Sequence, residues 1–181
     1  AIGDVANSHA LDAFAMTGAT GTIEHAQLVA HADIPRFARL GIGASVQPSH
    51  AVDDRDMAEE FWAGQTAVGY PMRELVDAGA NLLLGSDAPV ARLDPWTTMS
   101  DAVFRTRDER DPWRPHQRIA AAVTLAASTA GGSQTGSAIA PGDIADLAIV
   151  DRDPLAADTP GALRGTGVTA TLLGGRITHI G

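Results

Sequence analysis

The sequence predicts an α/β protein built on a parallel sheet. Apolar, strand-like segments alternate with helix-like segments up to about residue 130, as in parallel sheets whose strands are connected by helices. The segment Asn81–Leu84 is apolar without alternation, which is typical of a strand buried on both faces. Glycines follow the helix-like segments at Gly18, Gly41 and Gly79, where helices commonly end.

The individual elements follow from apolar spacing and from the positions of Gly, Pro and Asp. The predicted strands are Thr22–Ala26, Ile42–Gln47 and Asn81–Leu84. The predicted helices are Val5–Met16, a helix capped by Asp33 and ended by Gly41, Tyr70–Ala78, a helix opened by Pro95, and Ile119–Ala130. Two charged segments, one around Asp53, Asp54 and Asp56 and one at Arg105–Arg114, are predicted to be solvated loops.

The composition of the chain becomes rich in Gly, Ser and Thr from Gly131 onward. This change predicts a domain boundary near residue 135, between a first domain of residues 1–134 and a second of residues 135–181. The second domain is predicted to be all β, with strands at Ala145–Val150, Val168–Leu173 and Arg176–Ile180. Gly174 and Gly175 form a two-residue loop suited to a primed hairpin turn.

Composition limits the classes of function. The 181 residues carry 22 acidic and 13 basic side chains, for a net charge of −9, and no basic block occurs, so nucleic acid is not an expected partner. No apolar stretch approaches the roughly 18 residues of a membrane span, so a membrane is not an expected partner either. The chain has no Cys, and a metal would have to be held by His and carboxylates. All basic residues are Arg, which is typical of a GC-rich bacterial genome.

Polar residues end three successive predicted strands. His25 ends the first, Gln47 with His50 ends the second, and Asp87 ends the third. Parallel strands deliver their carboxyl ends to one rim, where the active sites of βα barrels lie. Because imidazole and carboxylate are standard ligands of zinc and similar divalent ions, His25 and Asp87 are candidate metal ligands. From position alone, a structural histidine and a turn aspartate remain equally good readings.

Six strings in order resemble the amidohydrolase superfamily, and most closely its YtcJ-like branch, which includes N-substituted formamide deformylases. They are Ala1–Asp4, Ile23–Gln27 (Ile-Glu-His-Ala-Gln), Ser45–His50 (Ser-Val-Gln-Pro-Ser-His), Gly85–Val90 (Gly-Ser-Asp-Ala-Pro-Val), Pro141–Leu147 and Gly174–Arg176. The resemblance implies that the chain holds strands six to eight of a (β/α)8 TIM-like barrel with their helices, followed by part of a small β-sandwich domain.

The resemblance also implies roles for particular residues. His25, after strand six, would ligate the metal. Asp87, after strand eight, would belong to the metal site and act catalytically, carrying a proton from the attacking water to the leaving nitrogen. Gln47 and His50 would contact substrate, with loop packing as the alternative. Asp4 would orient a neighbouring metal ligand, with capping of the first helix as the alternative.

The implied cofactor is a divalent metal, zinc, as one or two ions, and the implied substrate is a small-molecule amide. The family's other ligands would precede residue 1, so we expect a C-terminal piece of a hydrolase of non-peptide carbon–nitrogen bonds, with the true N-terminus missing and the cytoplasm as default location. Two ligands alone rarely hold a catalytic zinc. The alternative is a non-catalytic scaffold or interaction domain, including a homo-oligomer, that retains ligand residues as relics.

Overall fold

A computed structural model describes residues 1–129, 131–134 and 138–181. The helices are α1 (Asp4–Thr17), α2 (Ile34–Leu40), α3 (Pro48–Asp53), α4 (Arg55–Phe61), α5 (Met72–Asp77), α6 (Pro95–Phe104), α7 (Ala121–Ala127) and α8 (Pro160–Arg164), with 3-10 turns η1 (Pro115–Gln117) and η2 (Pro154–Ala156). The strands are β1 (Thr22–Glu24), β2 (Leu28–Val29), β3 (Gly43–Val46), β4 (Val68–Gly69), β5 (Leu82–Leu84), β6 (Leu147–Val150), β7 (Val168–Leu173) and β8 (Arg176–Ile180).

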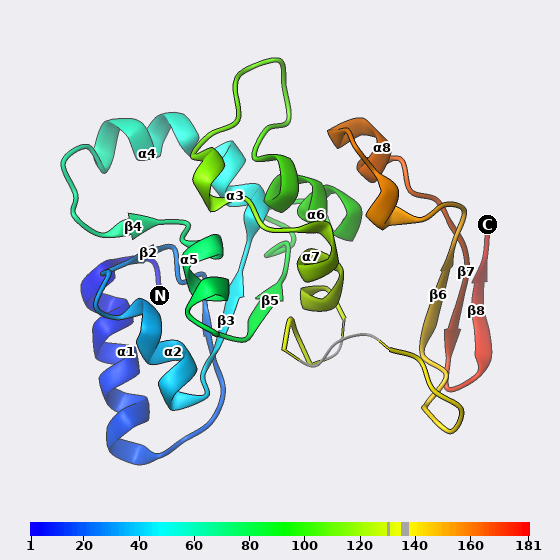
Figure 1. The fold of residues 1–181 in the computed structure, drawn as a ribbon, viewed down its shortest axis with the longest axis horizontal. Helices are drawn as coiled ribbons and strands as arrows, with labels where there is room; N and C mark the ends of the chain where they lie inside the picture. Colours follow the sequence, from blue (N-terminus) through cyan, green and yellow to red (C-terminus); the bar gives the residue numbers. More distant parts are fainter. Residues whose placement is uncertain (130, 135–137) are drawn as a thin grey trace.

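The predicted parallel sheet is confirmed, in the order β1-β3-β5. Ile23 on β1 lies opposite Ala44 on β3, and Ala44 lies opposite Leu82 on β5. In the view of Figure 1, α1 and α2 lie to the left of β3 and β5, and α6 and α7 lie to their right. The three strands form an open α/β sheet, and its carboxyl ends share one edge because all three run in the same direction.

The core of the α/β part lies between the sheet and its helices. Its buried members include Leu11, Ile23, Phe37, Leu75 and Leu82. Burying one such side chain contributes roughly 1.5–3 kcal/mol. Leu82 is fully buried, whereas Leu83 and Leu84 are half-buried. The expectation that both faces of this strand are buried is therefore only partly met, because β5 lies at the edge of the described sheet and not in its middle.

One predicted loop is wrong, and one predicted helix cap is found in position but without the hydrogen bonds of a cap. The acidic segment around Asp53 belongs to helices α3 and α4. Pro48 opens α3 at a position where its missing N–H costs nothing. Asp53 and Asp56 are exposed, whereas Asp54 is half-buried and accepts a hydrogen bond from the Tyr70 hydroxyl. Asp33 stands at the N-cap of α2, as predicted, but among the described residues its carboxylate accepts hydrogen bonds from the side chains of Ser8 and Arg36 and none from the backbone N–H groups of the helix.

The charged segment Arg105–Arg114 is a loop as predicted, but it is not simply solvated. Arg105 is fully buried, and its Nε donates to the carbonyl of Trp113 at 3.1 Å. Burial, followed by repulsion from Arg114, lowers the pKa of the Arg105 guanidinium to about 10. Arg107 and Arg110 pair with Asp53 and Asp56 on α3 and α4. The basic loop thus covers the acidic outer face of these two helices.

The C-terminal part forms an antiparallel sheet in the order β6-β7-β8. The predicted hairpin is confirmed, and Gly174 and Gly175 have φ values of +55° and +77°, as a primed turn requires. This sheet lies apart from the parallel sheet, and α8, which the sequence did not predict, packs against α6 (Figure 1). The predicted boundary at residue 135 and Ala130, the predicted end of the last α/β helix, lie outside the described residues.

Two further features complete the fold. β2 pairs antiparallel with β4, and two residues in each strand are too few to give a recognisable sequence pattern. Within the described residues, no helix has both the length and the apolar character needed to cross a bilayer.

Candidate metal centre

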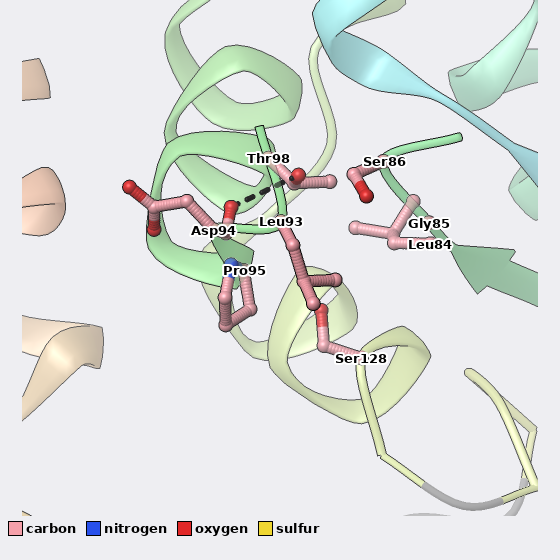
Figure 2. Close-up of a pocket in the computed structure, with 8 residues that line it drawn as sticks. All are labelled: Leu84, Gly85, Ser86, Leu93, Asp94, Pro95, Thr98 and Ser128. Atoms are coloured by element: carbon pink, nitrogen blue, oxygen red, sulfur yellow. Dashed lines mark hydrogen bonds between the residues drawn. The ribbon is translucent and has the colours of Figure 1, made fainter. Parts of the chain in front are cut away.

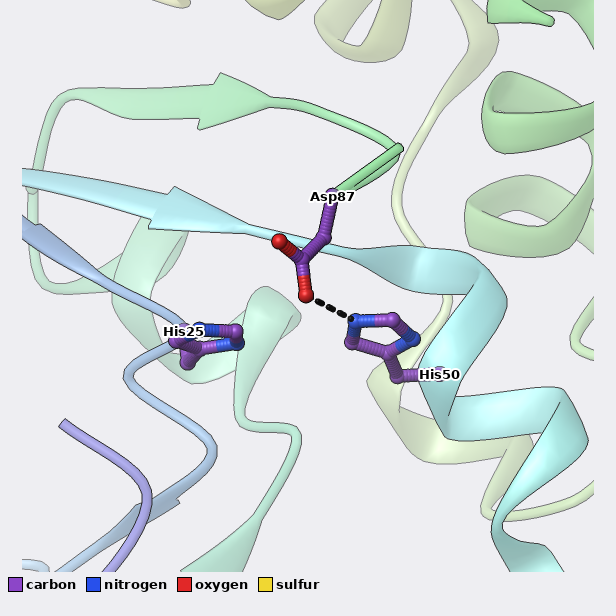
Figure 3. Close-up of side chains that lie close together, drawn as sticks. All are labelled: His25, His50 and Asp87. Atoms are coloured by element: carbon purple, nitrogen blue, oxygen red, sulfur yellow. Dashed lines mark hydrogen bonds and ion pairs between the residues drawn. The ribbon is translucent and has the colours of Figure 1, made fainter. Parts of the chain in front are cut away.

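Three titratable side chains converge at the carboxyl edge of the parallel sheet (Figure 3). His25 immediately follows β1, and Asp87 follows β5 after a two-residue link. His50 is the third residue of α3, the helix that directly follows β3. The convergence is a consequence of topology, since parallel neighbouring strands bring their carboxyl ends to one edge.

The distances within the group are short enough for one ion to be considered. His50 Nε2 lies 3.3 Å from Asp87 Oδ2, and the His25 and His50 rings are 6.0 Å apart, inclined by 17°. One ligand atom from each of the three residues lies within 4.8 Å of the other two. Two ligands of a single zinc ion are separated by at most about 4.3 Å, twice the usual bond length. A small adjustment of the side chains would therefore bring all three ligand atoms within reach of one ion.

The backbone holds two members of the group in an unfavourable conformation. His25 has a φ of +71° and Asp87 a φ of +57°. A non-glycine residue in the left-handed region costs of order 1 kcal/mol or more, and such residues cluster at functional sites. In both cases the residue with the positive φ lies within three residues of the end of a parallel strand, at the rim.

The exposure and hydrogen bonding of these side chains differ from those of polar groups with a purely structural role. His50 is 8% exposed, and the Asp87 side chain is 40% exposed. The Nδ1 atom of His25 is buried and, among the described residues, has no hydrogen-bond partner. A buried polar atom without a partner is costly unless something completes it. Two imidazole nitrogens and a carboxylate are the donor set that zinc and related ions accept, so the residues fit a divalent metal.

The other candidate residues are not members of this group. Gln47 is the N-cap residue of α3 and is buried. Gly3 is the N-cap of α1, and Asp4 is its first helical residue, so Asp4 does not cap the helix but adds negative charge to its first turn. Contact of Gln47 with substrate and orientation of a ligand by Asp4 stay predictions.

His50 is the member that the sequence interpretation placed in a different role, as a substrate contact. The available signal was the string Gln47-Pro48-Ser49-His50 directly after a strand. Pro48 starts the helix at once, so His50 falls in its first turn and faces the rim instead of lying in a longer loop. A histidine in the first turn of the helix that follows a parallel strand can therefore reach the same rim as a histidine at the strand end.

A buried carboxylate anchors the helix that carries His50. Asp101 of α6 is fully buried and accepts a hydrogen bond from Ser49 Oγ at 2.8 Å. The same carboxylate pairs with Arg107, and with Arg164 of α8 at 3.4 Å. Asp101 thus connects the residue next to His50, the basic loop and the C-terminal part of the chain.

A cavity of about 160 Å³ lies behind the β5 end of the site, between that strand and α6 (Figure 2). Leu84, Ser86 and Leu93 line it together with the start of α6. Its acidic side chain, Asp94, is committed to capping α6, since it accepts hydrogen bonds from the backbone of Trp96 and Thr97. Leu93 is largely exposed, so the cavity opens to solvent beside the rim.

An α/β fold with two histidines and an aspartate at the carboxyl edge of a parallel sheet has the ligand set of a metal-binding α/β protein. Comparison with known proteins makes the class specific. The family model described as "Amidohydrolase family" matches residues 1–179. The chain belongs to the amidohydrolase family, as the resemblance indicated.

Curated relatives match over nearly the whole chain. The chain is 33% identical to Protein LONG AFTER FAR-RED 3 of Arabidopsis thaliana, over 97% of the chain and 33% of that protein. It is 31% identical to N-substituted formamide deformylase of Arthrobacter pascens, over 87% of the chain and 30% of that enzyme. The chain therefore spans about a third of the length of these relatives.

Solved structures share the fold. An uncharacterized metal-dependent hydrolase from Pyrococcus furiosus superimposes with a TM-score of 0.59 at 30% identity, over 74% of this chain and 27% of that one. A variant of the atrazine chlorohydrolase TrzN from Arthrobacter aurescens, complexed with zinc, gives a TM-score of 0.56 at 20% identity over 86% of this chain and 35% of that one. The latter likeness concerns the fold alone.

Proposed function

We propose that the protein carrying this chain is a metal-dependent hydrolase of non-peptide carbon–nitrogen bonds, in which His25 and Asp87 bind a divalent metal, zinc. The observation that carries the proposal is the convergence of His25, His50 and Asp87 at the carboxyl edge of three parallel strands. Family membership supports hydrolysis, and the formamide deformylase among the relatives supports the amide bond as the target.

We also propose that the three parallel strands are the last three of a (β/α)8 barrel and that residues 135–181 belong to a small β-sandwich domain. Two observations support this. The chain matches only part of each relative, and its sheet is open while its neighbours of known structure are much longer chains. In such barrels the carboxyl ends of the strands carry the active site, which agrees with the position of the three side chains.

The proposed chemistry divides between the metal and the chain. A bound divalent ion polarises a carbonyl and makes water a nucleophile at neutral pH. Asp87 is the group that accepts the proton of the attacking water and returns it to the leaving nitrogen, a task suited to a half-exposed carboxylate at the rim. His50, 3.3 Å from Asp87 Oδ2, holds the carboxylate in the orientation that both transfers need.

Metal titration tests the assignment. The complete protein that carries this chain is stripped with chelator and titrated with zinc, while thermal stability and metal content after dialysis are recorded. Binding to the folded chain raises its stability by mass action, and we expect His25→Ala to lower zinc affinity at least tenfold. His179→Ala, an exposed histidine on β8, is the matched control. Wild-type affinity in His25→Ala would overturn the site.

The same titration distinguishes between two roles of His50, as a metal ligand or as a residue that orients Asp87. It also distinguishes between a hydrolase and a non-catalytic scaffold. If His50 orients Asp87, His50→Gln leaves zinc affinity within a few-fold and lowers amide hydrolysis, whereas loss of zinc affinity would make His50 a ligand. A non-catalytic scaffold with relic residues would bind no zinc and release no amine from an amide. That outcome would replace the hydrolase proposal by the scaffold.

A further inference from the structure

Two consecutive residues at the metal centre have a left-handed backbone conformation. His25 has a φ of +71° and Ala26 a φ of +39°, and neither is a glycine. Such residues are strained, and they persist only where the surrounding structure holds them in place. The contacts that hold this turn therefore decide where the His25 imidazole lies.

Gln27, the next residue, is held at two points by Tyr70. The backbone N–H of Tyr70 donates to the carbonyl of Gln27 at 2.6 Å, and Gln27 Nε2 donates to the Tyr70 hydroxyl at 2.5 Å. Both residues are buried, where the loss of a hydrogen bond is costly because water does not replace it. Tyr70 thus fixes both the main chain and the side chain of the residue that follows the strained turn.

The strand pair β2-β4 brings Tyr70 to this position. β2 begins directly after Gln27 and pairs with β4, which ends directly before Tyr70 (Figure 1). Tyr70 itself has a φ of +52°, which is rare for a bulky side chain. The unfavourable conformation falls on the residue whose hydroxyl bonds to Gln27, as expected of a residue that is kept for its position.

The same hydroxyl reaches the segment that carries His50. It donates to Asp54 Oδ2 at 2.9 Å, and the Asp54 backbone N–H donates to the carbonyl of His50 at 2.8 Å, at the end of α3. Burial, followed by the charge of Asp54, raises the pKa of Tyr70 well above its ordinary value, so the phenol keeps the proton that it donates. One hydroxyl therefore joins the turn that follows β1 to the helix that follows β3.

Packing of the ring is the alternative reason for a tyrosine at this position. The Tyr70 ring lies 5.7 Å from that of Trp62 and 5.6 Å from that of Trp113, between centroids, and a phenylalanine would make the same contacts. Gln27 and Tyr70 also line a cavity of about 120 Å³ beside α4, so packing alone leaves the Gln27 side chain room to move. The hydroxyl, and not the ring, restricts Gln27.

We infer that Tyr70 is a positioning residue of the metal centre, whose hydroxyl fixes the His25 turn relative to the helix that carries His50. His25 is the ligand that responds, because a single residue separates it from Gln27. The inference deepens the proposed function and rests on it for the presence of the metal. The placement of His25, in contrast, is a property of the metal-free protein and can be measured there.

Tyr70→Phe removes the hydroxyl and keeps the ring. In the complete metal-free protein, the imidazole signals of His25 are followed by NMR, with His25→Ala for their assignment. We expect Tyr70→Phe to shift and broaden these signals, because the turn is no longer held. The signals of His179, on β8, should stay unchanged.

Zinc titration of the same protein measures the consequence for the metal. We expect Tyr70→Phe to lower zinc affinity about tenfold, at the lower end of the range for residues that orient metal ligands. The matched control is Thr124→Val, which removes another buried hydroxyl that donates to a backbone carbonyl, on α7. This control should bind zinc as the wild type does.

Cobalt substitution distinguishes positioning from a general effect on stability. The visible absorption of bound Co(II) reports the geometry of its ligands, and a residue that only stabilised the fold would leave that spectrum unchanged. We expect Tyr70→Phe to change the spectrum and Gln27→Ala, which removes the same hydrogen bond from the other side, to change it in the same way. Because both variants act through one hydrogen bond, the double variant should differ little from either single variant.

The outcomes separate this inference from the proposed function. Unchanged His25 signals and unchanged zinc affinity in Tyr70→Phe, or in Gln27→Ala if Tyr70→Phe does not fold, would overturn the positioning role. Displaced His25 signals in a protein whose wild type binds no zinc would support the positioning role and reject the metal-dependent hydrolase. Zinc binding that depends on His25 but not on Tyr70 or Gln27 would keep the hydrolase and reject the inference.

Discussion

Two carboxylates on either side of α3 stand in opposite environments. Asp101 is fully buried and its charge is met by Arg107, Arg164 and the hydroxyl of Ser49. Asp87 is 40% exposed, has a positive φ, and in the described part of the chain is paired with His50. Ser49 and His50 are adjacent, so one helix end contacts both carboxylates.

This difference indicates a structural role for Asp101 and a chemical role for Asp87. A buried carboxylate with its hydrogen bonds fully made fixes the elements around it. A half-exposed carboxylate beside one imidazole keeps free lone pairs, which a metal ion or a transferable proton can use. Asp101 therefore supports the site by fixing α3, whereas Asp87 is available to act in it.

The largest effect is expected for Asp87→Asn in the complete enzyme. Asparagine keeps the shape of the side chain but cannot accept and return a proton, so amide turnover should fall about 10²- to 10⁴-fold. The free energy of unfolding should barely change, since the side chain is half-exposed. Steady-state kinetics and chemical denaturation measure both. Turnover like that of the wild type would refute the proton-transfer role of Asp87.

Asp101→Ala should show the reverse pattern. Removing a buried carboxylate leaves Arg107, Arg164 and Ser49 without their common partner, and stability should fall by about 3 kcal/mol. Denaturant unfolding measures this loss. The matched control is Asp108→Ala, an exposed aspartate paired with Arg110 in the basic loop, where no measurable change is expected. If both variants were equally stable, Asp101 would not be an anchor.

The smallest effect concerns Asp33, a third carboxylate, at the start of α2. Burial tends to raise its pKa, but hydrogen bonds from Ser8 and Arg36 and the charge of Arg36 outweigh this and lower it. A lowered pKa means that the stabilisation is complete above the unfolded value of about 3.9 and is lost as the pH falls through the folded value.

We therefore expect the free energy of unfolding to decrease below about pH 4, with part of that decrease absent in Asp33→Asn. Ser8→Ala removes one of the two hydrogen-bond donors and should leave an intermediate slope. Unfolding followed over a series of acidic pH values gives these slopes. Parallel pH profiles for the wild type and Asp33→Asn would assign the acid sensitivity to other groups.

The sequence predicted most of the α/β elements because their signals are local. Gly41 ends α2 with a φ of +65°, and Pro95 lies in the first turn of α6, as expected from the preferences of these residues. The strands Val168–Leu173 and Arg176–Ile180 are found with the predicted bounds, because two glycines fix the turn between them. Local errors arose where charge was taken as a sign of a loop, as around Asp53.

Only part of the candidate site could be predicted from the sequence. His25 and Asp87 were identifiable because each ends a predicted strand, and parallel strands share an edge. The pairing of Asp87 with His50 spans 37 residues and depends on how α3 leaves β3. The cavity beside Tyr70 joins side chains from residue 27 to residue 70, and no local pattern announces it.

By itself, the sequence determined the parallel α/β fold, the hairpin at Gly174, the family, and the two side chains that end strands at the rim. Each depends on residues close together in the chain, where backbone preference and apolar spacing act directly. The sequence also placed His50 at that rim, and the tertiary structure decided that its Nε2 lies 3.3 Å from Asp87 Oδ2. It also decided that Arg164, 63 residues beyond Asp101, neutralises that buried carboxylate. Contacts between distant segments determine which charged side chains are paired and which remain free.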